Sequence, residues 1–214
     1  MPAPKNIEKR EIVVDNIELR SEGEGEQRFV EGLGIVYDKE VELWDGYFEK
    51  IHPEAFTRCL KSGEEIKSYF NHDPDFVLST TRSKPALELY NTTEGLRFRS
   101  PIPPTSYGND LIINLERKNV RGASFSFFVE DDVITVDEKG RYHRHIIKGE
   151  IFEVGPVTNP AYSSAKVGVR SKEEMFKEAE TRCRHPVPES ESIETININK
   201  SEQRKKLLTI HGGI

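Results

Sequence analysis

Bulky and small residues alternate along the stretch 119–129, which is rich in β-branched and aromatic residues and contains no proline. Because successive side chains of a β-strand point to opposite faces, this alternation predicts a buried strand with one bulky face and one open face. The bulky positions are Phe125, Phe127 and Val129, and the small positions are Gly122, Ser124 and Ser126. A serine on an open face can be a filler or a nucleophile, and this stretch alone favours the filler.

Elsewhere the pattern predicts many short strands and two helices. Runs of β-branched and aromatic residues between Gly, Pro and Asn turns predict strands at 29–37, 68–70, 86–90, 96–100, 133–136, 142–147 and 151–154. Helical spacing of apolar residues predicts one helix at 52–60 and another that begins at Asn109 or Asp110 and ends at Lys118. Short strands with inserted helices indicate an α+β fold with a β-barrel-like mixed sheet core and a few flanking helices.

Changes in polarity divide the chain into three parts. Residues 1–26 are mostly polar and are interpreted as an N-terminal arm with an edge strand. Residues 27–169 hold the strands and helices, and they form the predicted domain. After Val169 the sequence becomes charged and rich in polar residues, so 170–214 is predicted to be a polar C-terminal tail, partly helical or disordered. One amphipathic helix is expected inside this tail, at 171–184.

Composition narrows the classes of function. Charged residues make up 32% of the 214 residues and hydrophobic residues 35%, which is polar for a globular protein. A net charge of -6 argues against a nucleic-acid partner. Two cysteines, Cys59 and Cys183, are too few for a disulfide framework or a cysteine zinc site, which favours a reducing compartment. The chain shows no signal-peptide pattern and no apolar run of membrane length, so we expect a cytoplasmic protein without membrane contact.

Three residues form a candidate catalytic set. Amide hydrolysis needs a nucleophile, a base that takes its proton, and usually a group that orients the base. Ser124 lies on the open strand face, and His72 lies in a polar turn at a strand end. Glu153 lies in the apolar run 151–154, where an unpaired carboxylate would be costly. Taken singly, His72 is better explained as a turn residue and Glu153 as a residue on the wet face of an edge strand.

The pair His143 and His145 allows a second interpretation. Residues two apart on a strand share a face, so these imidazoles could bind a metal together with His72 and Asp73. The basic residues around the pair instead favour a solvated hairpin. No phosphate-binding loop or zinc-protease motif is present, and no cofactor is expected.

Four segments, in this order, resemble the motifs of one protein family. They are 46–56 (GYFEKIHPEAF), 70–73 (FNHD), 121–127 (RGASFSF) and 153–162 (EVGPVTNPAY). Each is weakly specific alone, but together they resemble the tailed-phage prohead (capsid maturation) serine proteases over roughly Phe29 to Val167. That family is related in fold to the herpesvirus assemblins, so the resemblance implies an assemblin-like fold.

The resemblance also implies a role for each residue of the candidate set. By position, His72 is the general base, Ser124 the nucleophile and Glu153 the third member, although the herpesvirus enzymes use a second histidine there. The family usually has glycine two residues after the serine, whereas this chain has Ser126. Ser126 shares the predicted face of Ser124 and is therefore the rival nucleophile.

Substrates and partners follow from the same resemblance. Enzymes of this family cleave a scaffold protein, or the scaffold segment of the major capsid protein, inside the immature shell, and they usually cleave themselves. We therefore expect a serine endopeptidase that acts inside the prohead in the host cytoplasm. Its expected partners are the major capsid protein and the scaffold protein, and a homodimer is one assembly that the chain could form. The polar tail fits a packaging or self-cleavage segment. The alternative function is a catalytically inactive internal scaffold or capsid-binding module.

Overall fold

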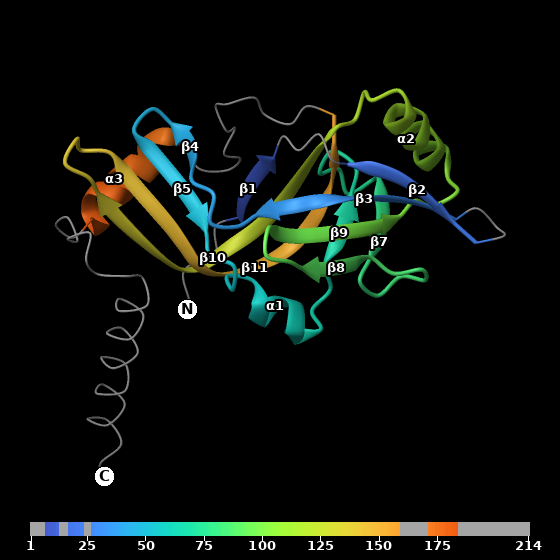
Figure 1. The fold of residues 1–214 in the computed structure, drawn as a ribbon, viewed down its shortest axis with the longest axis horizontal. Helices are drawn as coiled ribbons and strands as arrows, with labels where there is room; N and C mark the ends of the chain where they lie inside the picture. The colour runs from blue at the N-terminus through green and yellow to red at the C-terminus, as the bar shows by residue number, and fades with distance from the viewer. Residues whose placement is uncertain (1–6, 13–16, 24–26, 159–170, 184–214) are drawn as a thin grey trace, which may run out of the picture.

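The computed structural model describes residues 7–12, 17–23, 27–158 and 171–183. In this part of the chain, eleven strands and three helices form two sheets with flanking helices (Figure 1). The prediction of a strand-rich mixed fold with few helices is thereby confirmed. The predicted barrel is corrected, because the described strands form two open sheets and not a closed barrel.

The larger sheet holds the strand that carries Ser124. Its order is β1-β10-β11-β5-β4, and β6 and β7 extend it, since β6 pairs with β11. Its strands are β1 (Ile7–Ile12), β4 (Val41–Trp44), β5 (Tyr47–Ile51), β6 (Lys67–Tyr69), β7 (Val77–Thr80), β10 (Gly122–Val136) and β11 (Tyr142–Val157). The smaller sheet has the order β2-β3-β9-β8. Its strands are β2 (Glu18–Glu22), β3 (Gln27–Val36), β8 (Glu88–Asn91) and β9 (Gly95–Pro101).

Two of these strands are longer than the sequence pattern predicts. The expected strands at 119–129 and 133–136 merge into β10, and those at 142–147 and 151–154 merge into β11. The β10–β11 ladder shifts register at Ser126/Phe127, at Val129/Asp131 and at Asp131/Asp132. Bulges of this kind let a strand bend and continue, so the polar residues that suggested a break lie inside one long hairpin.

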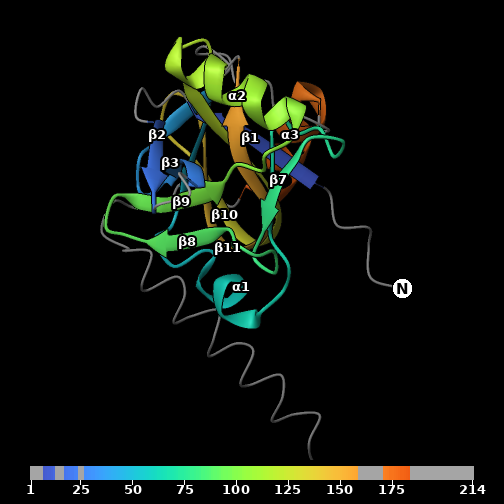
Figure 2. The same ribbon diagram turned by 90° about the vertical axis from the view of Figure 1, so that its right-hand side faces the viewer.

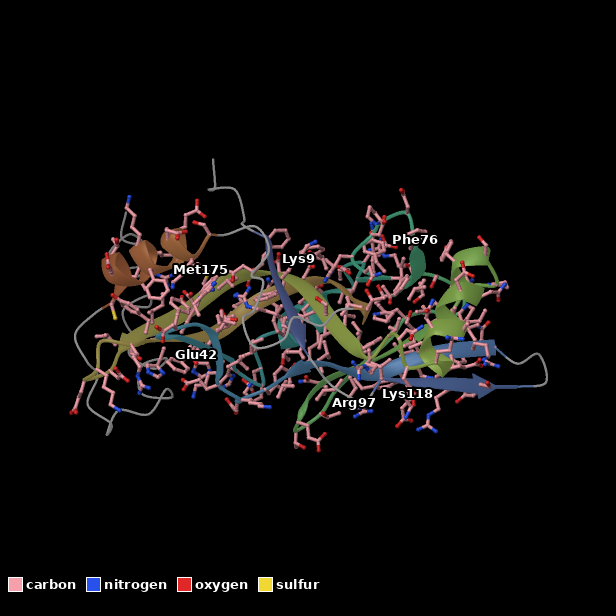
Figure 3. All side chains as sticks on the ribbon, turned by 90° about the horizontal axis from the view of Figure 1, so that it is seen from above. Lys9, Glu42, Phe76, Arg97, Lys118 and Met175 are labelled. Carbon is pink, nitrogen blue, oxygen red and sulfur yellow. The ribbon has the colours of Figure 1, made fainter. Side chains whose placement is uncertain are left out.

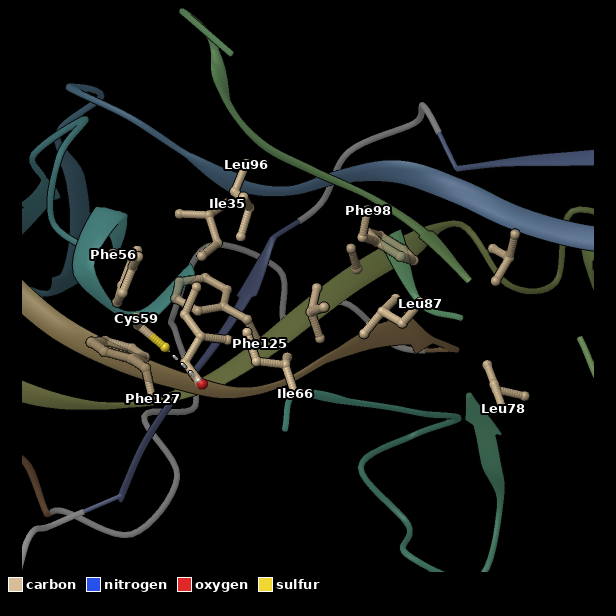
Figure 4. Packing of buried hydrophobic residues seen from close by; sticks show 14 of the residues in the cluster. Ile35, Phe56, Cys59, Ile66, Leu78, Leu87, Leu96, Phe98, Phe125 and Phe127 are labelled. Atoms are coloured by element: carbon tan, nitrogen blue, oxygen red, sulfur yellow. Dashed lines mark hydrogen bonds between the residues drawn. The ribbon is translucent and has the colours of Figure 1, made fainter. Parts of the chain in front are cut away.

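The hydrophobic core lies between the two sheets. Phe125 and Phe127 are fully buried with their rings 5.1 Å apart, and Phe56 approaches Phe127 edge-on at 5.7 Å. Ile35 and Leu96 of the smaller sheet face the same cluster (Figure 4). The predicted bulky face of β10 is therefore a core face. The opposite face is not open as predicted, because Ser124 and Ser126 are both 0% exposed.

Three helices flank the sheets: α1 (Thr57–Ser62), α2 (Ser106–Glu116) and α3 (Lys172–Arg182). Helices α1 and α2 lie on opposite sides of the strands (Figure 2). α2 begins before the predicted Asn109, because the Thr105 side chain accepts a hydrogen bond from the Gly108 amide and caps the helix. None of the helices in the described ranges is long and apolar enough to cross a membrane.

Helix α3 lies in the segment predicted as a polar tail. Ser171 caps it through a reciprocal capping box with Glu174, which explains why a helix forms at the position that the sequence predicted. Met175 and Ala179 are buried against Leu43, Tyr47 and Ile134, and they form a second, smaller apolar cluster. In Figure 1, α3 lies beside β4 and β5, at the end of the larger sheet. This helix therefore packs on the sheet.

Candidate active site

The three predicted catalytic residues come from three different elements that meet at one place. Ser124 lies on β10, and Glu153 lies on the neighbouring strand β11, opposite Ser126 in the ladder. His72 follows β6, which pairs with β11 at Glu153. Two adjacent strands and one loop thus bring together residues that are up to 81 positions apart in the sequence.

The loop that carries His72 is held to the end of β11. Asn71 donates its amide hydrogen to the Pro156 carbonyl at 3.0 Å, and its Oδ1 atom accepts a hydrogen bond from the Thr158 amide at 2.9 Å. Asn71 and His72 both have positive φ, 56° and 61°. Asparagine tolerates this left-handed region, but it is uncommon for histidine. Such conformations persist where the surroundings fix them, often at functional sites.

A glycine allows this loop to lie so close to the strand. Gly155 is paired with Ser124 in the β10–β11 ladder. A Cβ atom at Gly155 would lie 2.1 Å from the carbonyl oxygen of Tyr69, three residues before His72. Since the neighbouring atom is backbone, no side chain can move aside to make room. The close approach of β6 to β11 at this point therefore requires glycine.

The side chains of the three residues form a continuous hydrogen-bonded chain. Nδ1 of His72 lies 2.6 Å from Oε2 and 2.8 Å from Oε1 of Glu153. Nε2 of the same ring lies 2.5 Å from Oγ of Ser124. The carboxylate can hold the proton on Nδ1, which leaves Nε2 free to accept the hydroxyl proton. A carboxylate, an imidazole and a hydroxyl in this order are the groups that base-assisted attack by a serine requires.

This chain of groups is shielded from water. Ser124 is 0% exposed, Glu153 is 3% exposed, and the His72 side chain is 10% exposed. A buried carboxylate is costly unless it is paired, and Glu153 has the imidazole as its partner. Low exposure also strengthens each electrostatic interaction in the site. A second acceptor also lies within reach of the Ser124 hydroxyl, because the Arg10 carbonyl oxygen on β1 is 2.9 Å from Oγ.

Ser126, the rival nucleophile, lies on the other side of the imidazole. Its Oγ donates a hydrogen bond to Oε2 of Glu153 at 2.8 Å and lies 3.4 Å from Nδ1 of His72. It is therefore next to the ring nitrogen that faces the carboxylate, while Ser124 is next to the nitrogen that can accept a proton. The sequence marked Ser126 as a departure from the family pattern, but gave no sign of its contact with Glu153.

The alternative metal set is not brought together. Nδ1 of His143 lies 2.8 Å from Oε1 of Glu40, and its ring stacks on Phe48. Both ring nitrogens of His145 are buried without a hydrogen-bond partner. His72 is bound to Glu153 and Ser124. Within residues 7–12, 17–23, 27–158 and 171–183, no group of three or more His, Cys, Asp or Glu residues is arranged to hold a metal ion.

Comparison with known proteins places the chain in a family and finds a similar solved structure. A family model described as the caudovirus prohead serine protease matches residues 15–179. The chain is also similar to the structure of the bacteriophage T4 capsid assembly protease, gp21, with a TM-score of 0.52. The two share 12% identity over 73% of this chain and 99% of that chain, a likeness that shows the fold alone. None of the curated proteins matches this chain.

Proposed function

This chain belongs to the caudovirus prohead serine protease family, and we propose that Ser124, His72 and Glu153 are the catalytic residues of a prohead maturation endopeptidase. The four segments that carry the resemblance all lie inside the matched residues 15–179. The observation that supports the catalytic roles is the unbroken chain from Glu153 through His72 to Ser124 Oγ, with separations of 2.6 and 2.5 Å.

In the proposed mechanism, His72 accepts the proton of Ser124 through Nε2 as Oγ attacks the carbonyl carbon of the scissile bond. The imidazolium then gives that proton to the leaving amine, and an acyl-enzyme remains. Water, deprotonated by the same imidazole, attacks the ester and releases the second product. Glu153 holds the ring in the correct tautomer and stabilises the imidazolium, and Ser126 orients the carboxylate through its hydrogen bond.

The proposed substrates are the scaffold protein, or the scaffold segment of the major capsid protein, inside the prohead in the host. Self-cleavage belongs to the same proposal. The similar T4 protein is described as a capsid assembly protease, which agrees with this substrate class. The alternative, a catalytically inactive scaffold module, is less well supported, because such a module has no need of a buried carboxylate, imidazole and hydroxyl in hydrogen-bonded order.

Co-expression with the capsid and scaffold proteins tests the assignment. Wild-type protein is expected to shorten one of these partners, as measured by mass spectrometry of the products. Ser124→Ala should lower the rate of cleavage by several orders of magnitude while leaving the fold intact. Ser126→Ala is the matched control, with the same change two residues away on the same face. An active Ser124→Ala variant beside an inactive Ser126→Ala variant would transfer the nucleophile to Ser126.

A further inference from the structure

Strand β1 lies directly beside the candidate nucleophile. It pairs antiparallel with the edge of β10 that faces away from β11, with Lys9 opposite Ser126 and Glu11 opposite Ser124. Lys9 is labelled on this strand in Figure 3, where the molecule is seen from above. β1 is an end strand of the described sheet, so β10 without β1 would present an unpaired edge next to Ser124.

The backbone of β1 occupies the space that a substrate needs. Attack requires the carbonyl carbon of the scissile bond to lie about 3–3.5 Å from the nucleophile. The carbonyl oxygen of Arg10 already lies 2.9 Å from Ser124 Oγ, and Ser124 is 0% exposed. A peptide from outside therefore cannot reach Ser124 while β1 is in place.

The same contact also competes with the general base. A serine hydroxyl has one proton to donate, and here two acceptors are within reach, the Arg10 carbonyl oxygen and Nε2 of His72. While the hydroxyl donates to Arg10, its proton is not available to His72. β1 thus blocks the approach to the nucleophile and opposes its activation, as an inhibitor does and a bound substrate does not.

Two charged side chains of this strand, Glu8 and Arg10, anchor it to the sheet through ion pairs. Oε2 of Glu8 lies 2.8 Å from Nη1 of Arg144, and Oε1 lies 2.9 Å from Nη2. Arg10 donates to both carboxylate oxygens of Glu49, at 2.6 and 2.7 Å. Burial raises the pKa of Glu8, but the charges of Arg144 and Arg10 outweigh burial and lower this pKa to about 2. Glu8 is therefore ionised at neutral pH.

The partners of these anchors keep other contacts when β1 leaves. Arg144 also donates to Asp132 at 2.6 Å and to Glu49 at 3.2 Å. Removing β1 would therefore leave both Arg144 and Glu49 with an oppositely charged neighbour, which avoids the large cost of an unpaired buried charge. Buried ion pairs contribute less than apolar packing of similar size, so an anchor of this kind suits a strand that must detach.

We propose that an extended substrate segment binds by pairing with the edge of β10 next to Ser124. In this structure β1 covers that edge, and the active site stays closed until β1 is displaced. This inference rests on the proposed function, since it assumes that Ser124 is the nucleophile. Addition of a strand to an exposed edge is a common way to bind an extended peptide. The substrate is then a segment that takes up the antiparallel register of β1.

Weakening one anchor tests the closing role. Glu8→Gln removes the charge that pairs with Arg144 and keeps the size of the side chain. We expect the full-length variant to react with a fluorophosphonate, a small serine-directed reagent, roughly tenfold faster than wild type, because hydrogen bonds to charged groups are among the stronger ones. Glu18→Gln on β2 is the matched control, with the same change on an edge strand of the other sheet, and its rate should equal that of wild type.

A reversible disulfide tests the closing role by locking β1 onto β10 instead of loosening it. Ile7 faces Phe128 in the ladder, and paired residues of antiparallel strands have Cα atoms about 4.5–5.5 Å apart, which suits a disulfide. In the Ile7→Cys/Phe128→Cys variant, oxidation should abolish both labelling of Ser124 and substrate cleavage, and a reductant should restore them. The single Phe128→Cys variant controls for the loss of the Phe128–Phe152 contact and for the two native cysteines.

Hydrogen exchange at residues 7–12 measures opening of β1 without any chemistry at Ser124, and it should be faster in Glu8→Gln. Equal labelling of the oxidised and reduced forms would overturn the closing role alone. So would a new N-terminus at Glu11, because β1 would then be a substrate. If exchange shows β1 opening but no form is labelled or cleaves, Ser124 is not the nucleophile, and the proposed function fails together with the inference.

Discussion

At the scale of single residues, the two serines on one face of β10 differ in the atoms around them. Ser124 Oγ faces the imidazole nitrogen that can accept a proton, whereas Ser126 Oγ binds the carboxylate behind the ring. Ser126 occupies a position at which the resembling family usually has glycine. A hydroxyl at that position provides Glu153 with a donor, and this donor favours one orientation of the carboxylate over others.

Replacing Ser126 should therefore slow cleavage without abolishing it. Ser126→Ala removes one hydrogen bond to a charged group, and such a bond typically contributes about 1.5–3 kcal/mol, so we expect a loss of roughly ten- to a hundredfold in kcat. KM should change little, because Ser126 is buried behind His72. Steady-state kinetics on a peptide from the capsid or scaffold protein measures both constants. A variant as inactive as Ser124→Ala would contradict a purely orienting role.

His145 gives the fold a pH dependence that is separate from the site. Burial, together with Lys50 and His52, lowers the pKa of His145 from 6.5 to about 4. Between these two pH values the unfolded chain binds a proton that the folded chain does not, so stability falls as the pH decreases from 6.5 to 4. The loss from this group should reach up to about 3 kcal/mol at pH 4.

The variant His145→Leu isolates this contribution. It keeps a buried apolar group at the position and removes the titrating ring. Urea unfolding of both proteins at pH 7, 5.5 and 4 should show that the wild type loses more stability over this range than the variant. Parallel pH dependences would show that His145 binds its proton equally in the folded and unfolded states.

At the scale of elements, the approach of β6 to β11 decides where His72 lies. Gly155→Ala places a Cβ atom 2.1 Å from the Tyr69 carbonyl oxygen, so β6 and the loop after it must move away. We expect kcat to fall by roughly a hundredfold, since a displacement of about 1 Å at a catalytic group has an effect of this size. The variant should also unfold more easily.

A second glycine of the same strand is the matched control. A Cβ atom at Gly149 would lie 2.6 Å from the Phe128 carbonyl oxygen, so Gly149→Ala is similarly crowded but lies away from His72. Both variants should lose stability. Only Gly155→Ala should also lose activity, because only this change displaces the general base, His72. Equal kcat values at a temperature where both are folded would contradict the positional role of Gly155.

Local patterns predicted much of this architecture, and long-range pairing accounts for the rest. Alternation along 119–129 identified the core face of β10, because side-chain direction in a strand depends only on position. The capping residue Ser171 and the helical spacing after it identified α3. The merging of four predicted strands into β10 and β11 was missed, because bulges depend on the partner strand. The barrel was wrong because sheet closure depends on pairing between distant strands.

The candidate site shows the same division. His72, Ser124 and Glu153 were found from short motifs, and the structure brings them into contact. The roles that follow from pairing were not found: Asn71 and Gly155 hold the loop, and Arg10 faces the nucleophile from another strand. An edge strand was expected in residues 1–26, but no local signal places β1 on the edge beside Ser124. Catalysis remains a proposal for all three site residues.

At the scale of the whole molecule, the segment 170–214, predicted as a tail, contains a helix that packs on the larger sheet. Residues 172–182 form α3, whose Met175 and Ala179 are buried against β4, β5 and β10. Arg182 also reaches Asp132, which belongs to the same buried charge network as Arg144. Residues 184–214 lie outside the described part of the chain, and the boundary after residue 169 remains a prediction from composition. Loss of α3 would expose Leu43, Tyr47 and Ile134.

Self-cleavage is therefore expected to remove residues beyond α3 and to spare the helix. Two shortened chains, 1–183 and 1–170, test the stability side of this prediction. The first should unfold like the full chain, and the second should lose about 2–5 kcal/mol, the usual cost of deleting one large buried apolar side chain such as Met175. Urea unfolding measures both values, and equal stability of the two chains would show that α3 contributes nothing to the fold.

The cleavage itself is tested in assembled proheads, where the local concentration of the enzyme is high. Mass spectrometry of the wild-type chain should find a new C-terminus after Cys183, because a cut before Ser171 would remove the helix that covers the second apolar cluster. The Ser124→Ala chain should stay full-length in the same particles, since it lacks the proposed nucleophile. A new C-terminus between residues 159 and 170 would show that the active enzyme works without α3. Shortening of the Ser124→Ala chain in the absence of any wild-type copy would assign the cut to another protease.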